Sequence, residues 1–357
     1  MRHPLKATLV ASTALAAVVA VPASADAATH AWRVALNVHT TSYTEMDAVT
    51  IASKKDGWAF GNAYHAKSKP AIVPFSYRWN GKTWKYVALP KGLDGYVRGA
   101  SIRSASDAWA VSTPGESPGH GPNALLHWNG KRWSIAKRLP GRPTSVKAFS
   151  AKNVWVFGAD MAAKGSGTWH YNGSTWKAVK TGTFTPDNVS ATSSTNMWTF
   201  GRDAAPGKDF KTVGRFNGRT WTITNVGVEV NAILAVSSTS VWATGCTYGA
   251  KNPNTLLHWN GKSWKKAAAP GTRCLRDMAL DGYGGAWFSS RDGGVLLHRS
   301  KTGKWSTVRP PHPKGTLLPG QLAHVPGTGV TFATAITAVL APDGARRGAS
   351  GQLLKFS

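Results

Sequence analysis

Apolar and polar residues alternate along most of this chain, in short runs that are separated by Gly, Pro, Asn and Asp. One stretch shows the pattern four times in succession, as VRGASIRS (97–104), AWAVS (108–112), ALLHWN (124–129) and RWSIAKRL (132–139). Such alternation between turn-forming residues is typical of half-buried β-strands. Beyond the first thirty residues, no stretch carries a sustained 3.6-residue apolar period with helix caps. The pattern therefore predicts an all-β protein.

Two motifs recur along the chain at intervals of about 45 residues. The first is aromatic-Asn-Gly-x-x-Trp, at 79–84, 128–133, 171–176, 216–221 and 259–264, with a looser copy that ends at Trp305. The second is centred on a tryptophan, at 58, 109, 155, 198, 242 and 287, so that its copies are 51, 46, 43, 44 and 45 residues apart. Four short strands fit in each interval, and repeated four-stranded units of this length are typical of β-propellers.

The number of blades follows from the two ends of the chain. A tryptophan of the expected fourth strand occurs seven times, at 32, 84, 133, 176, 221, 264 and 305. Residues 321–357 supply only three strands, whereas AWRVALNV at 31–38 has the form of a fourth strand without a blade of its own. We therefore predict a single seven-bladed β-propeller over residues 29–357, in which the N-terminal strand closes the last blade and hides the sheet edges.

The Asn-Gly pairs predict the hairpins that join the third and fourth strands. A type I′ turn requires positive φ at both central residues, and Asn and Gly tolerate this best. We therefore expect Asn and Gly to occupy the tip of each of these hairpins.

These motifs resemble those of secreted bacterial β-propeller proteins whose blades carry WNGxxW and DVWAVG-like repeats, related in form to kelch and galactose-oxidase-type propellers. The resemblance covers about residues 31–357, in six clear copies and one degraded copy. It implies the fold and an exported binding module, and it leaves the ligand open because propellers host many unrelated activities.

The first residues have the layout of a secretory signal peptide. Basic residues at 2–6 precede an uncharged run at 7–21, and PASADAA then offers small-residue cleavage sites after Ala25 or after Ala27. We predict a signal peptide over residues 1–25, with cleavage up to residue 27 as the alternative, and a secreted protein without a membrane span. The apolar run is too short to cross a bilayer comfortably.

The tryptophans and cysteines are expected to serve the fold. Sixteen of the seventeen tryptophans fall at three repeat positions, which favours packing between blades over a ligand platform at one or two of them. Cys246 and Cys274 are expected to form a disulfide, because the protein is exported and their loops share one face of adjacent blades. A copper site like that of galactose oxidase is the alternative, but it lacks a matching histidine pattern.

The charge indicates which partners to expect. The chain carries 43 Lys and Arg against 16 Asp and Glu, a formal charge of +27. Four of the basic residues directly follow an Asn-Gly pair and are expected to form a basic rim: Lys82, Lys131, Arg219 and Lys262. Such a charge attracts polyanions. The expected partner is an anionic polysaccharide, a cell-wall polymer or non-specific nucleic acid, bound by a monomer. A solvated surface that only keeps the protein soluble is the alternative.

A second candidate site is the channel mouth. Alignment on the second-strand tryptophans places a polar residue eleven positions upstream in each repeat, near the start of the innermost strand: Asp47, Arg98, Thr144, Asp187, Asn231 and Arg276. Asp277 follows directly. Converging carboxylates and guanidiniums form a candidate binding site, and ion pairs that plug a hydrated channel are the alternative.

The sequence favours binding over catalysis. It holds no HExxH, P-loop or nucleophile-elbow motif, and nothing in it calls for a cofactor or a metal. A carbohydrate-active hydrolase or lyase at the channel mouth remains an alternative, and so does a scaffold for another envelope protein.

Overall fold

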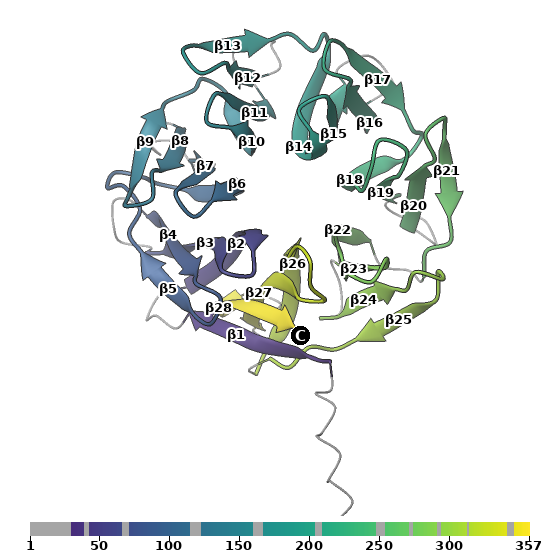
Figure 1. Ribbon diagram of the computed structural model, residues 1–357. Coiled ribbons are helices and arrows are strands. Elements are labelled where there is room, and N and C mark those ends of the chain that lie inside the picture. Colours follow the sequence, from purple (N-terminus) through teal and green to yellow (C-terminus); the bar gives the residue numbers. More distant parts are fainter. Residues whose placement is uncertain are drawn as a thin grey trace, which may run out of the picture. The chain divides into compact units, whose positions relative to one another are not determined.

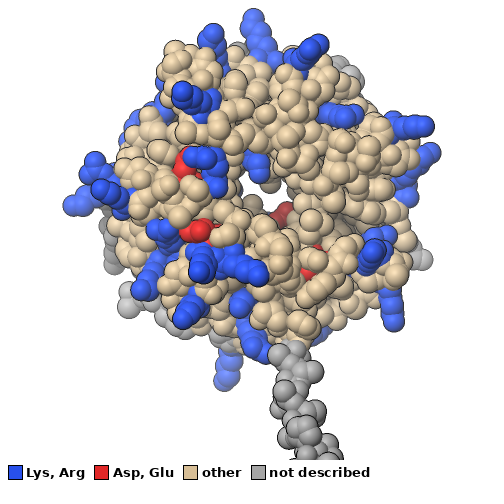
Figure 2. Space-filling view, viewed as in Figure 1, with Lys and Arg blue, Asp and Glu red and all other residues tan. Residues whose placement is uncertain are grey.

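A computed structural model gives the structure of the protein. It describes residues 30–357 except for 39–42, 66–70, 115–122, 160–166, 204–208, 248–253, 271–273, 291–293, 313 and 341–345. The expected signal peptide lies outside the described residues. The chain divides into two compact units, residues 1–30 and 31–357. The second unit is a ring of seven sheets (Figure 1), and a channel opens at its centre (Figure 2).

The strands form seven antiparallel sheets of four strands each, which confirms the seven-bladed β-propeller. The innermost strands are β2 (Tyr43–Ser53), β6 (Tyr96–Ser104), β10 (Arg142–Ser150), β14 (Phe184–Ser193), β18 (Glu229–Ala235), β22 (Leu275–Leu280) and β26 (Thr316–His324). The second strands are β3 (Asp56–Tyr64), β7 (Asp107–Thr113), β11 (Asn153–Ala159), β15 (Asn196–Asp203), β19 (Val241–Cys246), β23 (Ala286–Ser290) and β27 (Thr331–Leu340). The third strands are β4 (Ile72–Trp79), β8 (Ala124–Trp128), β12 (Thr168–Tyr171), β16 (Asp209–Phe216), β20 (Asn254–Trp259), β24 (Leu296–Arg299) and β28 (Arg346–Phe356). The outermost strands are β5 (Trp84–Val87), β9 (Trp133–Lys137), β13 (Trp176–Val179), β17 (Trp221–Asn225), β21 (Trp264–Ala267), β25 (Trp305–Val308) and β1 (Trp32–Val38).

The two ends of the chain meet in the seventh blade, as predicted. Its strands follow the order β1-β28-β27-β26, so the first strand of the chain is the outermost strand of the last blade. β1 runs antiparallel to β28, with Trp32 opposite Phe356 and Val38 opposite Gly351. The ring therefore closes through backbone pairing between residues more than 300 positions apart.

The hairpins between third and fourth strands differ from the expected turn by one residue. In the first blade the amide of Asn80 donates to the carbonyl of Thr83 at 3.3 Å, so Gly81 and Lys82 form the tip. Gly81 adopts the left-handed conformation, with φ +95°. The side chain of Asn80 instead accepts hydrogen bonds from the amides of Lys82 and Thr83. The expectation that Asn and Gly form the tip was wrong, because asparagine acts here as a side-chain cap.

Five of the second-strand tryptophans pack against the outermost tryptophan of the next blade, which confirms their expected role between blades: Trp58, Trp109, Trp155, Trp198 and Trp287. Trp58 of the first blade lies 4.9 Å from Trp133 of the second, between ring centroids. At the closing blade, Trp287 lies 5.1 Å from Trp32. None of the seventeen indole side chains belongs to an exposed residue, and Trp58 is only 1% exposed.

The two cysteines form the expected disulfide. Cys246 ends β19 in the fifth blade and Cys274 precedes β22 in the sixth, with 5.5 Å between their Cα atoms. The disulfide therefore links two neighbouring blades.

Candidate functional site

The polar series expected at the channel mouth coincides with a β-bulge in each innermost strand. In β2 the register passes from Met46 opposite Gly61 to Ala48 opposite Phe60, which leaves Asp47 without a partner in the ladder. The same shift in the following five blades leaves one residue unpaired each time: Arg98, Thr144, Asp187, Asn231 and Arg276. A bulge redirects the side chain of its extra residue, so these positions lie inside the strands and point away from the regular ladder.

The seventh blade has a bulge of its own that the sequence alignment missed. In β26, Gly320 and Gln321 together lie between the pairs Pro319–Ala335 and Leu322–Ala333. The amide of Gln321 donates to Thr334 Oγ1 at 2.8 Å. In this blade Phe332 replaces the second-strand tryptophan. Because the alignment depended on that tryptophan, it did not include the seventh blade.

Several bulge residues hold neighbouring blades together. Asn231 Nδ2 donates to the carbonyl of Leu275 in the next blade at 3.3 Å. The amide of Val49 donates to Gln321 Oε1 at 2.8 Å, across the joint between the seventh and first blades. Thr144 Oγ1 donates to the carbonyl of Asp187. This part of the ring therefore serves the contact between blades.

Asp47 is the most strongly perturbed carboxyl group at the mouth. Burial raises its pKa from 3.8 to about 7, and the nearby charge of Glu45 adds to the rise. Asn62 Nδ2 donates to Asp47 Oδ2 at 3.0 Å, which opposes the shift together with the charge of Arg98. A carboxyl group with a pKa near neutrality is suited to proton transfer or to a pH-dependent contact.

Arg98 brings two of the expected acids into one electrostatic group. Its charge lowers the pKa of both Asp47 and Asp187, although burial makes the net shift of each pKa upward. The guanidinium also lies 4.7 Å from the ring centroid of Tyr96. Arg98 is exposed at the mouth, so the group Asp47–Arg98–Asp187 combines one accessible cation with two recessed acids.

Asp277 is bound into the sheet instead. The amide of Leu322 in the next blade donates to Asp277 Oδ2 at 2.7 Å. Burial raises the pKa of Asp277 to about 6, and the charge of Arg276 partly offsets that rise. Arg276 itself is exposed. Asp277 therefore contributes to the blade joint, while Arg276 stays open to solvent.

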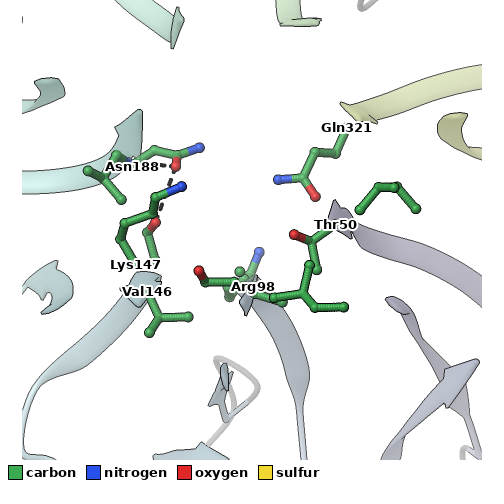
Figure 3. A pocket seen from close by; sticks show the side chains of 13 residues that line it. Thr50, Arg98, Val146, Lys147, Asn188 and Gln321 are labelled. Atoms are coloured by element: carbon green, nitrogen blue, oxygen red, sulfur yellow. Dashed lines mark hydrogen bonds between the residues drawn. The ribbon is translucent and has the colours of Figure 1, made fainter. Parts of the chain in front are cut away.

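A cavity of about 170 Å³ lies further inside the channel. Figure 3 shows the side chains of Thr50, Arg98, Lys147, Asn188 and Gln321 converging on it from five innermost strands. Asn188 Oδ1 accepts hydrogen bonds from Ser145 Oγ and from the amide of Val189. The lining is polar and includes two cations.

Lys147 is the member of this cavity that sequence reasoning missed. Burial lowers the pKa of its amine, and no ion pair of the described residues neutralises it. The corresponding position, three residues after the bulge, is Thr50, Ser101, Ser190, Leu234 and Ala279 in the other blades of the alignment. A single lysine at a position that is uncharged in these blades was therefore a signal that the repeat alignment contained.

The described residues offer no cluster of three or more His, Cys, Asp or Glu side chains suited to a metal ion. The channel instead combines guanidinium, ammonium, amide and carboxyl groups. These groups can bind an anion or a polyol, and Asp47 can exchange a proton with a bound molecule.

The residues predicted to form a basic rim lie in the hairpins between third and fourth strands. All four predicted residues are exposed at the tips of third-to-fourth-strand hairpins: Lys82, Lys131, Arg219 and Lys262. Lys301 and Lys304 are exposed at the corresponding hairpin of the sixth blade. In the third blade, Ser174 takes this place in YNGSTW. Figure 2 shows Lys and Arg side chains around the whole circumference of the face it presents, with few acidic side chains, which lie toward the centre.

The acids near these hairpins are already in contact with arginine or histidine side chains. Asp56 lies 3.5 Å from Arg78, and Asp107 is 2.7 Å from Arg103. Asp281 Oδ2 is 2.7 Å from His298 Nε2. No lysine of the described part of the chain takes part in an ion pair. The acids therefore do not screen the lysines of the rim by direct contact.

The third-strand histidines belong to the repeat and show how the acids are held. His127 stacks on Trp109 with 4.2 Å between ring centroids, and its Nε2 lies 3.1 Å from Asp107 Oδ1. His170, His258 and His298 likewise stack on the second-strand tryptophans of their own blades. Arginine takes this place in two other blades, where Arg78 and Arg215 lie over Trp58 and Trp198. The sequence did not predict that histidine and arginine side chains lie over the second-strand tryptophans.

The fold and the two faces define a seven-bladed β-propeller with a polar channel mouth and a basic rim. The chain matches no protein-family model. No curated protein sequence matches it either. Known proteins that are similar to this chain were therefore found among solved structures.

Three solved propellers illustrate the likeness. A YCF48 structure bound to a D1 peptide has a TM-score of 0.60 at 14% identity, covering 91% of this chain and 96% of that one. A streptogramin B lyase has a TM-score of 0.61 at 11% identity, covering 90% and 96%. The GH74 xyloglucanase from Xanthomonas campestris has a TM-score of 0.58 at 12% identity, covering 89% of this chain and 55% of that one. At these identities the likeness shows the fold alone, and a kinship with kelch or galactose-oxidase propellers stays a prediction.

The described residues contain strands and turns but no helix. This part of the chain therefore has no helix that is long and apolar enough to cross a membrane.

Proposed function

We propose that the protein is an exported, non-catalytic module that binds anionic polymers or acidic glycans through its basic rim. The observation that carries this proposal is the state of the charges on that face. The hairpin lysines are exposed and take part in no ion pair, while Asp56, Asp107 and Asp281 are each held by an arginine or a histidine.

The arrangement of the rim suits a long ligand. Hairpins of five of the seven blades carry an exposed cation, so one flexible polyanion can contact several blades at once. Binding of this kind depends on charge neutralisation and on the release of counterions. It therefore discriminates little between polyanions of different chemical structure. The absence of a helix from the described residues argues against recognition of base sequence in a DNA major groove.

An extracellular location agrees with the disulfide between Cys246 and Cys274, because disulfides persist in oxidising compartments. The signal-peptide pattern of residues 1–25 supports the same location. Anionic cell-wall polymers, acidic polysaccharides and released nucleic acid are the polyanions available there.

The test measures binding of the purified protein to heparin, as a model sulfated polysaccharide, at about 50 and about 200 mM salt. We expect the affinity to fall steeply with salt. A variant with Lys82, Lys131, Arg219 and Lys262 all changed to Gln should bind more weakly and with a shallower dependence. Each lost ionic contact is expected to reduce the steepness of the fall of log K with log salt concentration by about 0.7 to 0.9.

The matched control removes the same charge elsewhere. Lys91, Lys180, Lys211 and Lys314 are also exposed but lie outside the hairpins of the rim, and their change to Gln should alter binding much less. Equal losses in the two variants would show that only the net charge matters. Binding that does not weaken with salt would contradict the proposal.

A second candidate function, a carbohydrate-active hydrolase or lyase, is favoured by one observation at the channel mouth. Asp47 has a pKa of about 7 and lies within the electrostatic reach of Arg98, which fits a general acid or base beside a cation. Screening against acidic and neutral polysaccharides tests this candidate. It requires Asp187→Ala or Arg98→Ala to abolish turnover in a folded protein, and unchanged turnover in both variants would dismiss it.

A further inference from the structure

A second cavity, of about 530 Å³, lies between the fifth and sixth blades, at the side of the ring that carries the third-to-fourth-strand hairpins. Its walls include Trp242 and His258 from the fifth blade, Arg299 and Lys301 from the sixth, and His324 from the end of β26. It therefore lies on the same side of the ring as the basic rim, away from the channel-mouth group of Asp47, Arg98 and Asp187.

The repeat explains why this cavity is open. The last residue of the third strand is aromatic in six blades: Trp79, Trp128, Tyr171, Phe216, Trp259 and Phe356. This ring packs onto the second-strand aromatic residue of the preceding blade. For example, Trp128 lies 4.8 Å from Trp58, and Phe356 lies 4.7 Å from Trp287, between ring centroids.

The sixth blade has Arg299 at this position instead. Its guanidinium lies 4.9 Å from the ring centroid of Trp242, where the other blades place an aromatic ring. A flat, charged group thus replaces a bulky apolar one, and the space beside it becomes part of the cavity.

The turn between the first two strands of the sixth blade enlarges the opening. Here the chain reads Asp281-Gly-Tyr-Gly-Gly, and all three glycines line the cavity. Gly282 and Gly284 have positive φ, of +82° and +89°. Other side chains are disfavoured in that conformation, so the backbone itself keeps this wall bare.

The described lining is basic. Arg299, Lys301, His258 and His324 face the cavity, and none of the described residues that line it is Asp or Glu. Asp281 adjoins it, but the carboxylate already accepts hydrogen bonds from the amides of Tyr283 and Gly285 and contacts His298.

Among the described residues, no acid forms an ion pair with Arg299. Its Nε is buried without a hydrogen-bond acceptor among these residues, and burial, together with the charge of Arg299, lowers the pKa of His258. Desolvated cations are costly unless they are paired, so this arrangement gains most from an anion that enters the cavity. His324 Nδ1 is likewise buried without a partner.

We propose that this cavity is a binding site for one carboxylate-bearing sugar unit of an acidic glycan, with Arg299 as the group that pairs with the carboxylate. The inference rests on the proposed function, because it names the chemical unit that the binding module recognises. A planar carboxylate can accept two parallel hydrogen bonds from a guanidinium.

The remaining walls suit the body of a sugar ring. The volume lies within the range of small-molecule sites, which are largely apolar with a few convergent polar groups. Val236, Leu280 and Trp242 supply apolar surface, while Ser240 and the two histidines supply groups that can bond to hydroxyls.

Isothermal titration of the purified protein with sodium glucuronate tests the site, with glucose and inorganic phosphate as comparison ligands. We expect glucuronate to bind and glucose to bind at least about tenfold more weakly, the effect of one lost hydrogen bond to a charged group. Phosphate that binds as well as glucuronate would show a simple oxyanion site, and equal binding of glucose would show that the charge plays no part. Either result would overturn the proposal.

Two variants examine the role of Arg299. Arg299→Met should weaken glucuronate binding at least about tenfold, and Arg299→Trp, which restores the residue type of the other blades, should abolish it while filling the space. The matched control is Arg215→Met, which removes a guanidinium stacked on Trp198 at 5.1 Å outside the cavity. It should leave glucuronate binding within about twofold. Equal losses in Arg215→Met and Arg299→Met would overturn the assignment.

The same titrations separate this site from the proposed function. The variant that lacks the four rim cations should bind heparin weakly and still bind glucuronate. Arg299→Trp should lose glucuronate and retain most of the salt-dependent binding of heparin. Loss of glucuronate binding in the rim variant would show that the cavity is not a separate site. Heparin binding without any glucuronate binding would refute the cavity site and leave the proposed function intact.

Discussion

Trp84 of the first blade packs edge-on against Phe332 of the seventh, with ring centroids 5.3 Å apart and an interplanar angle of 86°. Phe332 occupies the second-strand position that is tryptophan in the other six blades. The contact thus resembles other blade joints, such as that between Trp58 and Trp133, although it connects the first complete blade with the last one. Both side chains are buried.

Truncation of either ring should destabilise the whole propeller. Trp84→Ala and Phe332→Ala should each lower the free energy of unfolding by about 3–5 kcal/mol, measured by urea denaturation. Because the two rings share one contact, the double variant should lose less than the sum of the single losses. Strictly additive losses would show that the two rings do not support one another.

Removal of the first strand should open the ring. Deletion of residues 29–40 takes away β1, which pairs with β28 from Trp32 to Val38. The edge of β28 and the ring of Trp287 then become exposed, so we expect an insoluble or partly unfolded product. Size-exclusion chromatography and thermal unfolding provide the measurement. A monomeric deletion variant with one cooperative transition would contradict the closure.

Loss of the disulfide should weaken the joint between the fifth and sixth blades. Cys246→Ala combined with Cys274→Ala removes a link across 28 positions of sequence. The expected loss is on the order of 3 kcal/mol in the chain-entropy model. Dithiothreitol should lower the thermal midpoint of the natural protein toward that of the variant and leave the variant unchanged. An effect of the reductant on the variant would point to another cause.

Asp47 should make stability depend on pH. Its pKa is about 7 in the folded protein against 3.8 for a free side chain. Between these two values the folded protein keeps the proton that the unfolded chain has lost, so the contribution of Asp47 to stability declines as pH rises through this window. Asp47→Asn should therefore be more stable than the natural protein at pH 8 and nearly equal to it at pH 4.

Denaturation midpoints at the two pH values measure this effect. Asp277 and Asp187 also have raised pKa values, so Asp47→Asn should flatten the pH dependence only in part. A gain of the same size at both pH values would mean that Asp47 does not titrate in this range.

Lys147 should cost stability for a similar reason. Burial lowers the pKa of its amine, and no ion pair of the described residues offsets the charge. Lys147→Met keeps the length of the side chain and removes the charge, so the variant should be more stable at pH 7. Urea denaturation gives the measurement. A destabilised variant would show that the ammonium makes a favourable contact inside the channel.

The repeat explains how much the sequence could predict. The spacing of Trp58, Trp109 and their equivalents set the blade boundaries, and Trp32 predicted the closing strand because it stood outside any complete blade. The position of Asp47 in the alignment also matched the bulge, since a bulge occupies the same place in each repeat. The blade boundaries, the closing strand and the bulge position could be predicted because each blade repeats the same short sequence pattern and the same strand arrangement.

The features that were missed depend on contacts between blades. Nothing in the WNGKTW motif shows whether Asn80 occupies the tip of its turn or caps it with its side chain. The burial of Lys147 depends on four other innermost strands that surround the same cavity. Arg299 was visible as a departure from the aromatic position, yet its meaning required knowledge that this position packs on the preceding blade.

The pairing of β1 with β28 also constrains the order in which the molecule forms. The first strand of the propeller has its partner in residues 346–356, which are synthesised after every other strand of the propeller. Six blades consist of consecutive strands and can assemble as the chain lengthens, whereas the seventh must wait for the complete chain. Long-range pairing of this kind slows folding. The final step in forming the native protein is therefore expected to be a slow one, during which an unfinished blade is open to proteases and chaperones.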